Sequence, residues 1–417
     1  MTNPLACIEI TSSVVRLLIG YEEDGKPVVL YTKEEPILGL VQNGKVVDQE
    51  GLVHVLESFH HIRDDAAKLM LTINEVSLVL PAINFGVHSI SDSTQTVESN
   101  NSINKIDVTN VISMINKKAA GQSGDSDIVD VIPKEFILDN GRRVSSAPIG
   151  QQSRSLAINA MVHTLPNDIR KSYTDALTMA KFRLKRICVN SFCNALYVES
   201  DPNLPKNCFF IDIGTKITTI SLISGGQTYG AVAFFDGGEN LTSSISESFG
   251  LTMEVSEDLK RQYGYDARER AFKVSLAVAE EEGQAPRKIY QKDINNAIES
   301  RFETYSVLLK EMITKMELSG NGLDQLPIVF AGGGSQLKGL RLLLQSVFPG
   351  REMILCSPKV IGARSPRLTA LLGLVLASGH YTGCLEDNHR NVVNVSREAP
   401  KEEKKSRKSQ SGFKDEL

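Results

Sequence analysis

The chain has 417 residues, more than one hydrophobic core usually holds, so its length predicts two or more domains. Its 46 Lys and Arg nearly balance its 50 Asp and Glu, and the net charge of −4 argues against a nucleic-acid partner. No apolar run reaches the roughly 20 residues that span a bilayer, and the N-terminus lacks a signal-peptide pattern. These features predict a cytoplasmic protein with reduced cysteines, since the six cysteines form no Cys-x-x-Cys pair.

Residues 1–80 are expected to form the first part of one lobe. Residues 5–36 contain two apolar strands joined by a turn at 23–25 and a third extended segment. Asn43-Gly44 predicts a second tight turn. The helix that follows is expected to bury Leu52, Val55, Leu56 and Phe59. His60 and His61 would lie at its far end, where adjacent side chains diverge and a metal site is not favoured.

Residues 81–165 have a different character from the rest of the first lobe. A strand is followed by a polar segment, a helix at "DVTNVISMINKKA", a Gly/Ser/Asp break and two further strands. This order predicts a compact module inserted into the first lobe, which then resumes over residues 166–205.

The second lobe is expected to cover residues 206–380. It opens with "FFIDIGTKITTISLISGG", which reads as strand, turn and strand. A long helix from Gln291 to Leu318 has apolar residues at helical spacing. The segment "LPIVFAGGGSQLKGL" then predicts a buried strand, a triple-glycine turn and a helix. Residues 381–417 are charged and lack periodicity, so a disordered tail is expected.

Three turns have the features of a nucleotide site: residues 9–13, 212–216 and 331–335. Glycine lets the backbone approach a ligand closely, and successive N–H groups in such a turn bind anions. An acidic residue at a strand end suits a hydrated magnesium ion. One glycine turn alone is weak support, so the prediction depends on the order and spacing of all three.

This order resembles the superfamily of actin and hexokinase, and within it the family of the bacterial cell-division protein FtsA. The segments "GLVQNGKVVD", "DVIPKEFILDNGRRVSSAPIG", "INNAIESRFE", "VFAGGGSQLKGL" and "SPRLTALLGL" carry the resemblance over most of residues 1–380. It implies an actin-like (ribonuclease H-like) α/β fold of two lobes, with an FtsA-type (SHS2) module inserted in the first. It also implies an outer part of the second lobe at about 250–320 and a last helix at about 366–380 that returns to the first lobe.

The resemblance also implies an ATP site between the lobes. Asp212 and Gly214 would lie at the phosphates, with Asp212 on the water shell of Mg²⁺. Glu257 and Lys260 would flank the adenosine. The full set of implied binding residues is Glu9, Thr11, Ser12, Asp212, Gly214, Thr215, Lys216, Glu257, Lys260, Gly332, Gly333 and Gly334. No catalytic residue is implied.

Both phosphate turns depart from the family pattern. In the first turn Thr11 stands where the family has glycine, and Val14 stands where it has lysine, so a phosphate-facing cation is missing. In the second turn the family has three glycines, a threonine and then an acidic residue. This chain has Gly214, Thr215, Lys216, Ile217 and, at the acidic position, Thr219. Lys216 is the candidate for a replacement positive charge. These changes predict that ATP and Mg²⁺ binding is weakened or lost at the phosphate end, while the purine end is kept, with negligible hydrolysis.

By resemblance, the chain is a cytoplasmic division adaptor. It would bind the C-terminal peptide of the tubulin-like protein FtsZ through residues 250–320, self-associate into filaments and contact later division proteins through the inserted module. It would link the division ring to the cytoplasmic face of the membrane at the septum. The basic tail residues Lys404, Lys405, Arg407 and Lys408 would supply weak, salt-dependent lipid binding, with Phe413 and Leu417 as apolar anchors.

Two alternatives remain open from the sequence. One is an adaptor like PilM, which holds a peptide of a pilus-assembly membrane protein. The other is an active ATPase or small-molecule kinase of the same superfamily. The second alternative needs a catalytic carboxylate at the transferred phosphate, where this chain has Thr219.

Overall fold

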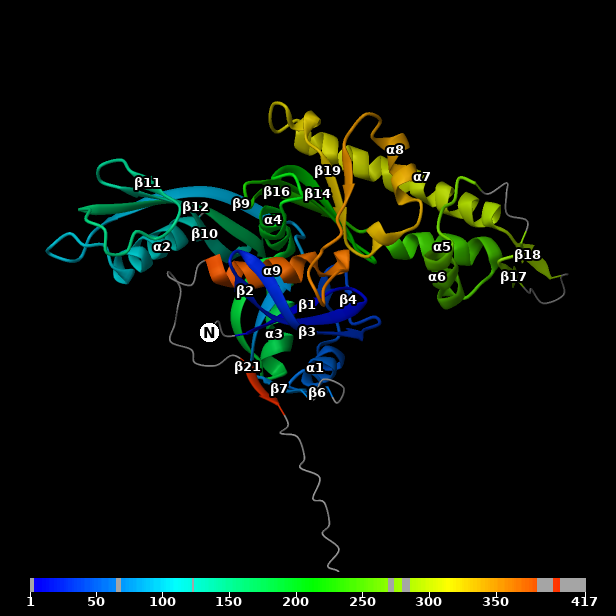
Figure 1. Cartoon of the computed structure of the whole chain (residues 1–417), viewed down its shortest axis with the longest axis horizontal. Helices are drawn as coiled ribbons and strands as arrows, with labels where there is room; N and C mark the ends of the chain where they lie inside the picture. Colours follow the sequence, from blue (N-terminus) through cyan, green and yellow to red (C-terminus); the bar gives the residue numbers. More distant parts are fainter. Residues whose placement is uncertain are drawn as a thin grey trace, which may run out of the picture.

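The computed structural model describes residues 4–64, 69–121, 124–268, 274–279, 286–380 and 393–397. They form two lobes and a module that projects from the first lobe (Figure 1). The first-lobe sheet is built from Leu5–Ile10 (β1), Val14–Glu23 (β2), Lys26–Pro36 (β3), Glu75–Leu80 (β8) and Arg183–Val189 (β13). The second-lobe sheet is built from Asn207–Ile213 (β14), Thr218–Ser224 (β15), Gln227–Phe234 (β16), Ile328–Ala331 (β19) and Met353–Leu355 (β20).

The two sheets repeat one pattern of strand order and direction. The first sheet has the strand order β13-β8-β1-β2-β3. The second sheet, read in the equivalent direction, has the order β20-β19-β14-β15-β16. In each, three neighbouring strands are parallel, and two hairpin strands follow antiparallel. Parallel strands covered on both faces need continuous apolar sequence, which β1 and β14 have. The strand ends of β1 and β14 therefore occupy equivalent places in the two lobes.

The tight turns of the first lobe follow the sequence prediction. Asp24 and Gly25 join β2 to β3 with φ of 50° and 73°. Asn43 and Gly44 join the short strands Val41–Gln42 (β4) and Lys45–Val46 (β5) with φ of 48° and 70°. Asn, Asp and Gly tolerate this left-handed region, so both hairpins are confirmed.

The first-lobe helix ends earlier than its sequence suggested. Helix α1 spans Gln49–Glu57, and His61 begins the strand His61–Asp64 (β6), which pairs with Leu69–Ile73 (β7). The expected place of the two histidines on a helix is therefore wrong. The ring nitrogens of His60 lie 2.7 Å and 2.6 Å from the carbonyl oxygens of Ile73 and Ala180, so this ring serves the backbone and not a metal.

The inserted module has the predicted order of strand, helix, strand and strand. It contains Gly86–Gln95 (β9), Lys105–Ala120 (α2), Ser126–Leu138 (β10), the short strand Arg143–Val144 (β11) and Ser155–Pro166 (β12). The sheet order is β11-β10-β12-β9, and α2 covers one face (Figure 1). Asn104 and Asp107 form a capping box at the start of α2. The module has a separate apolar core.

The outer part of the second lobe is mainly helical. It contains Gly238–Phe249 (α5), Met253–Gln262 (α6), the hairpin Ala277–Ala279 (β17) and Arg287–Ile289 (β18), and the long helix Gln291–Glu317 (α7). Helix α7 matches the predicted helix to within one residue. The short helix Leu340–Val347 (α8) packs against α7.

Two apolar helices lie at the centre of the molecule (Figure 1). Helix Asn190–Ser200 (α4) contacts helix Thr369–His380 (α9), and α9 also packs on β1 and β2 of the first lobe. A Cβ on Gly373 would come within 1.8 Å of the Cys193 carbonyl oxygen, so only glycine allows this close approach. The five cysteines in the described chain are buried free thiols. The remaining first-lobe helix is Asn167–Met179 (α3).

The C-terminal region departs from the predicted tail in one place. Val393–Arg397 (β21) forms a strand that pairs antiparallel with β7, so disorder is the wrong prediction for these five residues. Alternating valine and polar residues fit a strand, a short signal that the charged surroundings obscured. The rest of the predicted tail, including its basic cluster, lies outside the described residues. Within the described chain, no helix is long and apolar enough to cross a membrane.

Candidate functional site

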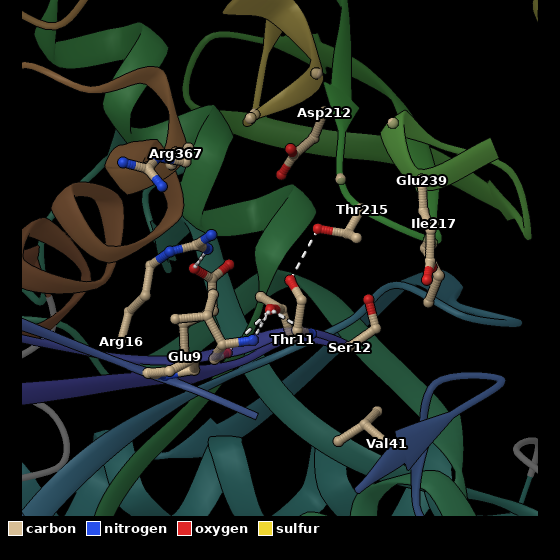
Figure 2. Close-up of a pocket in the computed structure, with 18 of the residues that line it drawn as sticks. Glu9, Thr11, Ser12, Arg16, Val41, Asp212, Thr215, Ile217, Glu239 and Arg367 are labelled. Atoms are coloured by element: carbon tan, nitrogen blue, oxygen red, sulfur yellow. Dashed lines mark hydrogen bonds and ion pairs between the residues drawn. The ribbon is translucent and has the colours of Figure 1, made fainter. Parts of the chain in front are cut away.

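A cavity of about 770 Å³ lies between the lobes and is lined by all three predicted glycine turns (Figure 2). The turn after β1, the turn after β14 and the turn after β19 meet there because β1, β14 and β19 end at the same crevice. Every residue that the sequence singled out for binding lines this cavity except Lys216. The Lys216 ammonium instead lies 3.4 Å from a carboxylate oxygen of Glu239, so it does not replace the missing phosphate cation.

The first turn is closed by its own side chains. Thr11 Oγ1 donates to the Val14 carbonyl at 2.9 Å and accepts the Val14 N–H at 3.1 Å. The Val14 amide is therefore engaged within the turn. Ser13 Oγ lies 2.8 Å from Thr215 Oγ1, and this hydrogen bond joins the turns of the two lobes (Figure 2).

The second turn is closed against the start of α5. The Gly214 N–H donates to the Ile217 carbonyl at 2.9 Å. The Gly238 and Glu239 N–H groups donate to the Gly214 and Thr215 carbonyls at 3.0 Å and 2.9 Å. The N–H groups at the start of a helix are ordinarily the ones that bind phosphate. Here two of them are satisfied by the protein itself.

Charged residues at the base of the cavity neutralise one another. Arg16 donates to Glu9 at 2.8 Å and to Glu34 at 3.2 Å, and Arg16 and Glu9 are both buried. Arg367 reaches the other Glu34 oxygen at 3.4 Å. Burial, followed by the neighbouring Glu9 carboxylate, raises the pKa of Asp212 to about 6, against the opposing effect of Arg16. Figure 2 shows the Asp212 carboxylate pointing into the cavity above this pair.

Arg16 is a cation near the first turn that the sequence did not lead us to expect. It lines the cavity from β2, two residues beyond Val14, and residues two apart on a strand share one face. This alternation was the signal in the sequence that could have located it. The contacts of Arg16 with two carboxylates leave little positive charge for a ligand phosphate.

A second polar cluster lines the cavity where the resemblance places the adenosine. The Lys260 ammonium donates to the Gly238 carbonyl at 2.8 Å, to Thr242 Oγ1 at 2.7 Å and to Glu257 at 2.6 Å. Burial lowers the pKa of Lys260, and Glu257 partly opposes that effect. Thr242 Oγ1 also lies 2.5 Å from the Glu257 carboxylate. Lys260 and Glu257 are therefore positioned together at the cavity wall.

The triple-glycine turn lines the cavity and packs against the end of β14. Gly332 has a φ of 78°, and a Cβ there would lie 2.2 Å from an Asp212 carboxylate oxygen. A Cβ on Gly334 would lie 2.3 Å from Ile213 Cγ2. These contacts fix the turn directly beneath the end of β14, where only glycine fits.

Thr219 stands where the resemblance implies an acidic residue. Thr219 lies opposite Asp212 in the β14–β15 pair and lines the cavity. Its hydroxyl has no acidic function in this pH range. Among the described residues, no group of three or more His, Cys, Asp or Glu side chains is placed to hold a metal ion.

Two family models match this chain. The model described as "Cell division protein FtsA" matches residues 209–373, and "SHS2 domain inserted in FTSA" matches residues 86–164. Together they cover more than half of the sequence. The chain belongs to the FtsA family of cell-division proteins. The second match lies on the module of β9 to β12, which is an FtsA-type insert.

Curated relatives from several bacteria agree with this assignment to the FtsA family. The chain is 25% identical over 376 residues to the cell division protein FtsA of Bacillus subtilis (strain 168), covering 88% of this chain and 82% of the relative. It is 24% identical over 381 residues to the FtsA protein of Streptococcus pneumoniae serotype 2 (strain D39), covering 90% and 80%.

Solved structures show that the fold is actin-like. A PilM-PilN type IV pilus biogenesis complex is similar with a TM-score of 0.58 at 16% identity, covering 92% of this chain and 99% of that chain. MreB5 of Spiroplasma citri bound to ADP is similar with a TM-score of 0.53 at 12% identity, covering 91% and 98%. At such identities these likenesses concern the fold alone.

Proposed function

We propose that this FtsA-family protein is a division adaptor that binds the C-terminal peptide of FtsZ, self-associates and links the division ring to the membrane without turning over ATP. Its site of action is the cytoplasmic face of the membrane at the septum, and its inserted module contacts later division proteins. The family assignment favours this role over that of a PilM-like adaptor.

The observation that carries the non-enzymatic part of the proposal is the closure of the phosphate end. Three features of an ATP site are engaged by the protein: the Val14 amide, the first N–H groups of α5 and the Arg16 guanidinium. Ser13 and Thr215 also meet where the two turns approach. This arrangement disfavours a bound polyphosphate, and the proposal assigns no step of hydrolysis to the chain.

The purine end has different properties. Glu257, Lys260 and the Gly332 to Gly334 turn all line the cavity. These residues support binding of the adenosine part of a nucleotide. Mg²⁺ would supply charge neutralisation for Asp212, whose neighbour Glu9 is also acidic. ATP and Mg²⁺ binding is therefore expected to be weak, and adenosine contacts are expected to dominate it.

The outer part of the second lobe is the proposed surface for the FtsZ peptide. Apolar side chains are exposed there, including Val255 on α6 and Val278 on β17, which are 42% and 48% exposed. Exposed apolar side chains next to charged neighbours are common where peptides bind. Helix α5 packs against both α6 and the long helix α7 in this region.

A pull-down of FtsZ with the full chain tests the proposed function. Wild-type protein is expected to retain FtsZ equally with and without ATP and Mg²⁺. Val255→Asp and Val278→Asp are expected to weaken the capture at least about tenfold, since a carboxylate in an apolar contact is costly. Val97→Asp, the same change at an exposed valine of the inserted module, is the matched control. No capture of FtsZ by the wild type under either condition would refute the adaptor role.

A further inference from the structure

The C-terminal strand β21 is added to the edge of the first lobe over its full length. Val393 pairs with Ile73, Val395 with Leu71 and Arg397 with Leu69. Figure 1 shows β21 beside β7 at the lower end of the first lobe, far from α7 and α8 of the second. The sheet β21-β7-β6 therefore joins the C-terminal region to the chain near residue 70.

The register of this pairing agrees with the amphipathic pattern of both strands. Val393 and Val395 stand opposite Ile73 and Leu71, which are buried in the first-lobe core. Asn394 and Ser396 stand opposite Thr72 and Met70, and Met70 is 44% exposed. A slip of one residue would place polar residues opposite the core. The pattern specifies this register.

The direction of the backbone hydrogen bonds of β7 shows which of its N–H and C=O groups β21 pairs with. The Ile73 N–H donates to the His60 carbonyl at 2.9 Å, so Ile73 and Leu71 bond toward β6. Because hydrogen bonds alternate along an antiparallel pair, the N–H and C=O groups of Thr72 and Met70 face β21. The bonding partners on β21 are Asn394 and Ser396. Without β21, this edge of β7 would present unpaired groups.

The pairing also shortens the stretch of sequence between the basic cluster and the nearest described element. Lys404 is 24 residues beyond His380, the end of α9, but seven residues beyond Arg397. An extended chain spans at most about 85 Å in the first case and about 25 Å in the second. A shorter tether raises the local concentration of the attached group at one surface.

We propose that Val393–Arg397 is an intramolecular mooring strand that fixes the exit of the basic tail beside the β6–β7 hairpin. The mooring directs this end of the first lobe toward an anionic lipid surface. The lipid part of this proposal rests on the membrane link proposed above, whereas the mooring itself rests on the strand pairing.

Hydrogen exchange at single-residue resolution tests the mooring in the full chain. The amide hydrogens of Asn394 and Ser396 are expected to exchange about 100-fold more slowly than those of Val395 and Arg397, whose N–H groups face away from β7. Ser396→Pro is expected to abolish the protection at Asn394, because it removes a ladder donor. Arg397→Pro is the matched control and is expected to leave it intact, because proline is tolerated at an open edge.

Three results of the exchange experiment would overturn the proposed mooring. Uniformly fast exchange over residues 393–397 overturns the proposal, as does equal loss of protection in both proline variants. Protection that rises with protein concentration also overturns it, because the strand would then be supplied by a second copy.

Energy transfer to a labelled bilayer tests the orientation separately. Vesicles of phosphatidylglycerol carry the acceptor, and a donor is attached at His61→Cys on β6 or at Leu318→Cys after α7, both exposed positions. Transfer is expected to be at least twofold stronger from position 61, and Ser396→Pro is expected to remove the difference while Arg397→Pro keeps it. Equal transfer from both positions in wild type overturns the directed orientation. No transfer from either, with exchange protection intact, refutes the membrane link and leaves the mooring standing.

Discussion

Ser13 and Thr215 are 202 residues apart in sequence, yet their hydroxyl oxygens lie 2.8 Å from each other across the cleft. Each belongs to the turn that follows the first strand of its lobe's hairpin. The family resemblance implies that these two turns flank nucleotide phosphates. Here a direct contact joins the lobes at that point.

Removing this contact is expected to weaken the link between the lobes. Ser13→Ala and Thr215→Val should each lower the free energy of unfolding by about 1 kcal/mol, and the double variant should lose less than the sum. Chemical denaturation of the four proteins measures this coupling. Ser12→Ala is the control, since Ser12 lines the same cavity without a described cross-lobe bond. Strictly additive losses would show that the two hydroxyls do not interact.

Asp212→Asn is expected to stabilise the protein at neutral pH. Burial and Glu9 raise the pKa of Asp212 to about 6, above its ordinary value of 3.8. The ionised group therefore lowers stability above about pH 6, and this penalty disappears as the pH falls toward 4. Thermal unfolding should show the variant more stable by on the order of 1 kcal/mol at pH 7.5, and nearly equal to wild type at pH 4.5. A variant less stable at pH 7.5 would contradict this assignment.

The Glu257 carboxylate is expected to matter through Lys260 and not through Arg261. Glu257→Gln leaves the buried Lys260 ammonium without its carboxylate partner and should cost about 1–3 kcal/mol. Arg261 contacts the same carboxylate at 2.7 Å but is 71% exposed. Arg261→Gln should therefore cost less than about 0.5 kcal/mol. Equal losses in urea denaturation would mean that burial of Lys260 is not the cause.

Gly332 is expected to be replaceable by no other residue, for a reason beyond backbone strain. Its φ of 78° equals that of Gly350, which has open space around an added Cβ. Gly350→Ala should cost about 1 kcal/mol from strain alone. Gly332→Ala adds a clash with Asp212 and should cost at least about 2 kcal/mol more. Similar denaturation midpoints for the two variants would contradict the close packing of Gly332 against Asp212.

The turns and the long helix could be predicted from sequence because their causes are local. Asp24-Gly25 and Asn43-Gly44 accept left-handed backbone, and the apolar spacing of α7 sets its length. The end of α1 was missed because the competing strand β6 depends on pairing with β7, which the helical pattern does not contain.

The residues predicted from the sequence do line the cavity, except Lys216, but their contacts could not be predicted. The motif order brought the three turns to one cavity. The Ser13–Thr215 bond, the pairing of Lys216 with Glu239 and the neutralisation of Arg16 depend on distances between segments far apart in sequence. Strand β21 was missed because its short alternating pattern stands among charged residues.

The most direct test of the central claim is a titration with a fluorescent ATP analogue in Mg²⁺, combined with a phosphate-release assay. The account predicts a dissociation constant weaker than about 100 μM and no turnover above background, with binding strengthened at least about tenfold in the double variant Thr11→Gly, Val14→Lys. A low-micromolar dissociation constant for the wild type with Mg²⁺-dependent turnover would contradict it.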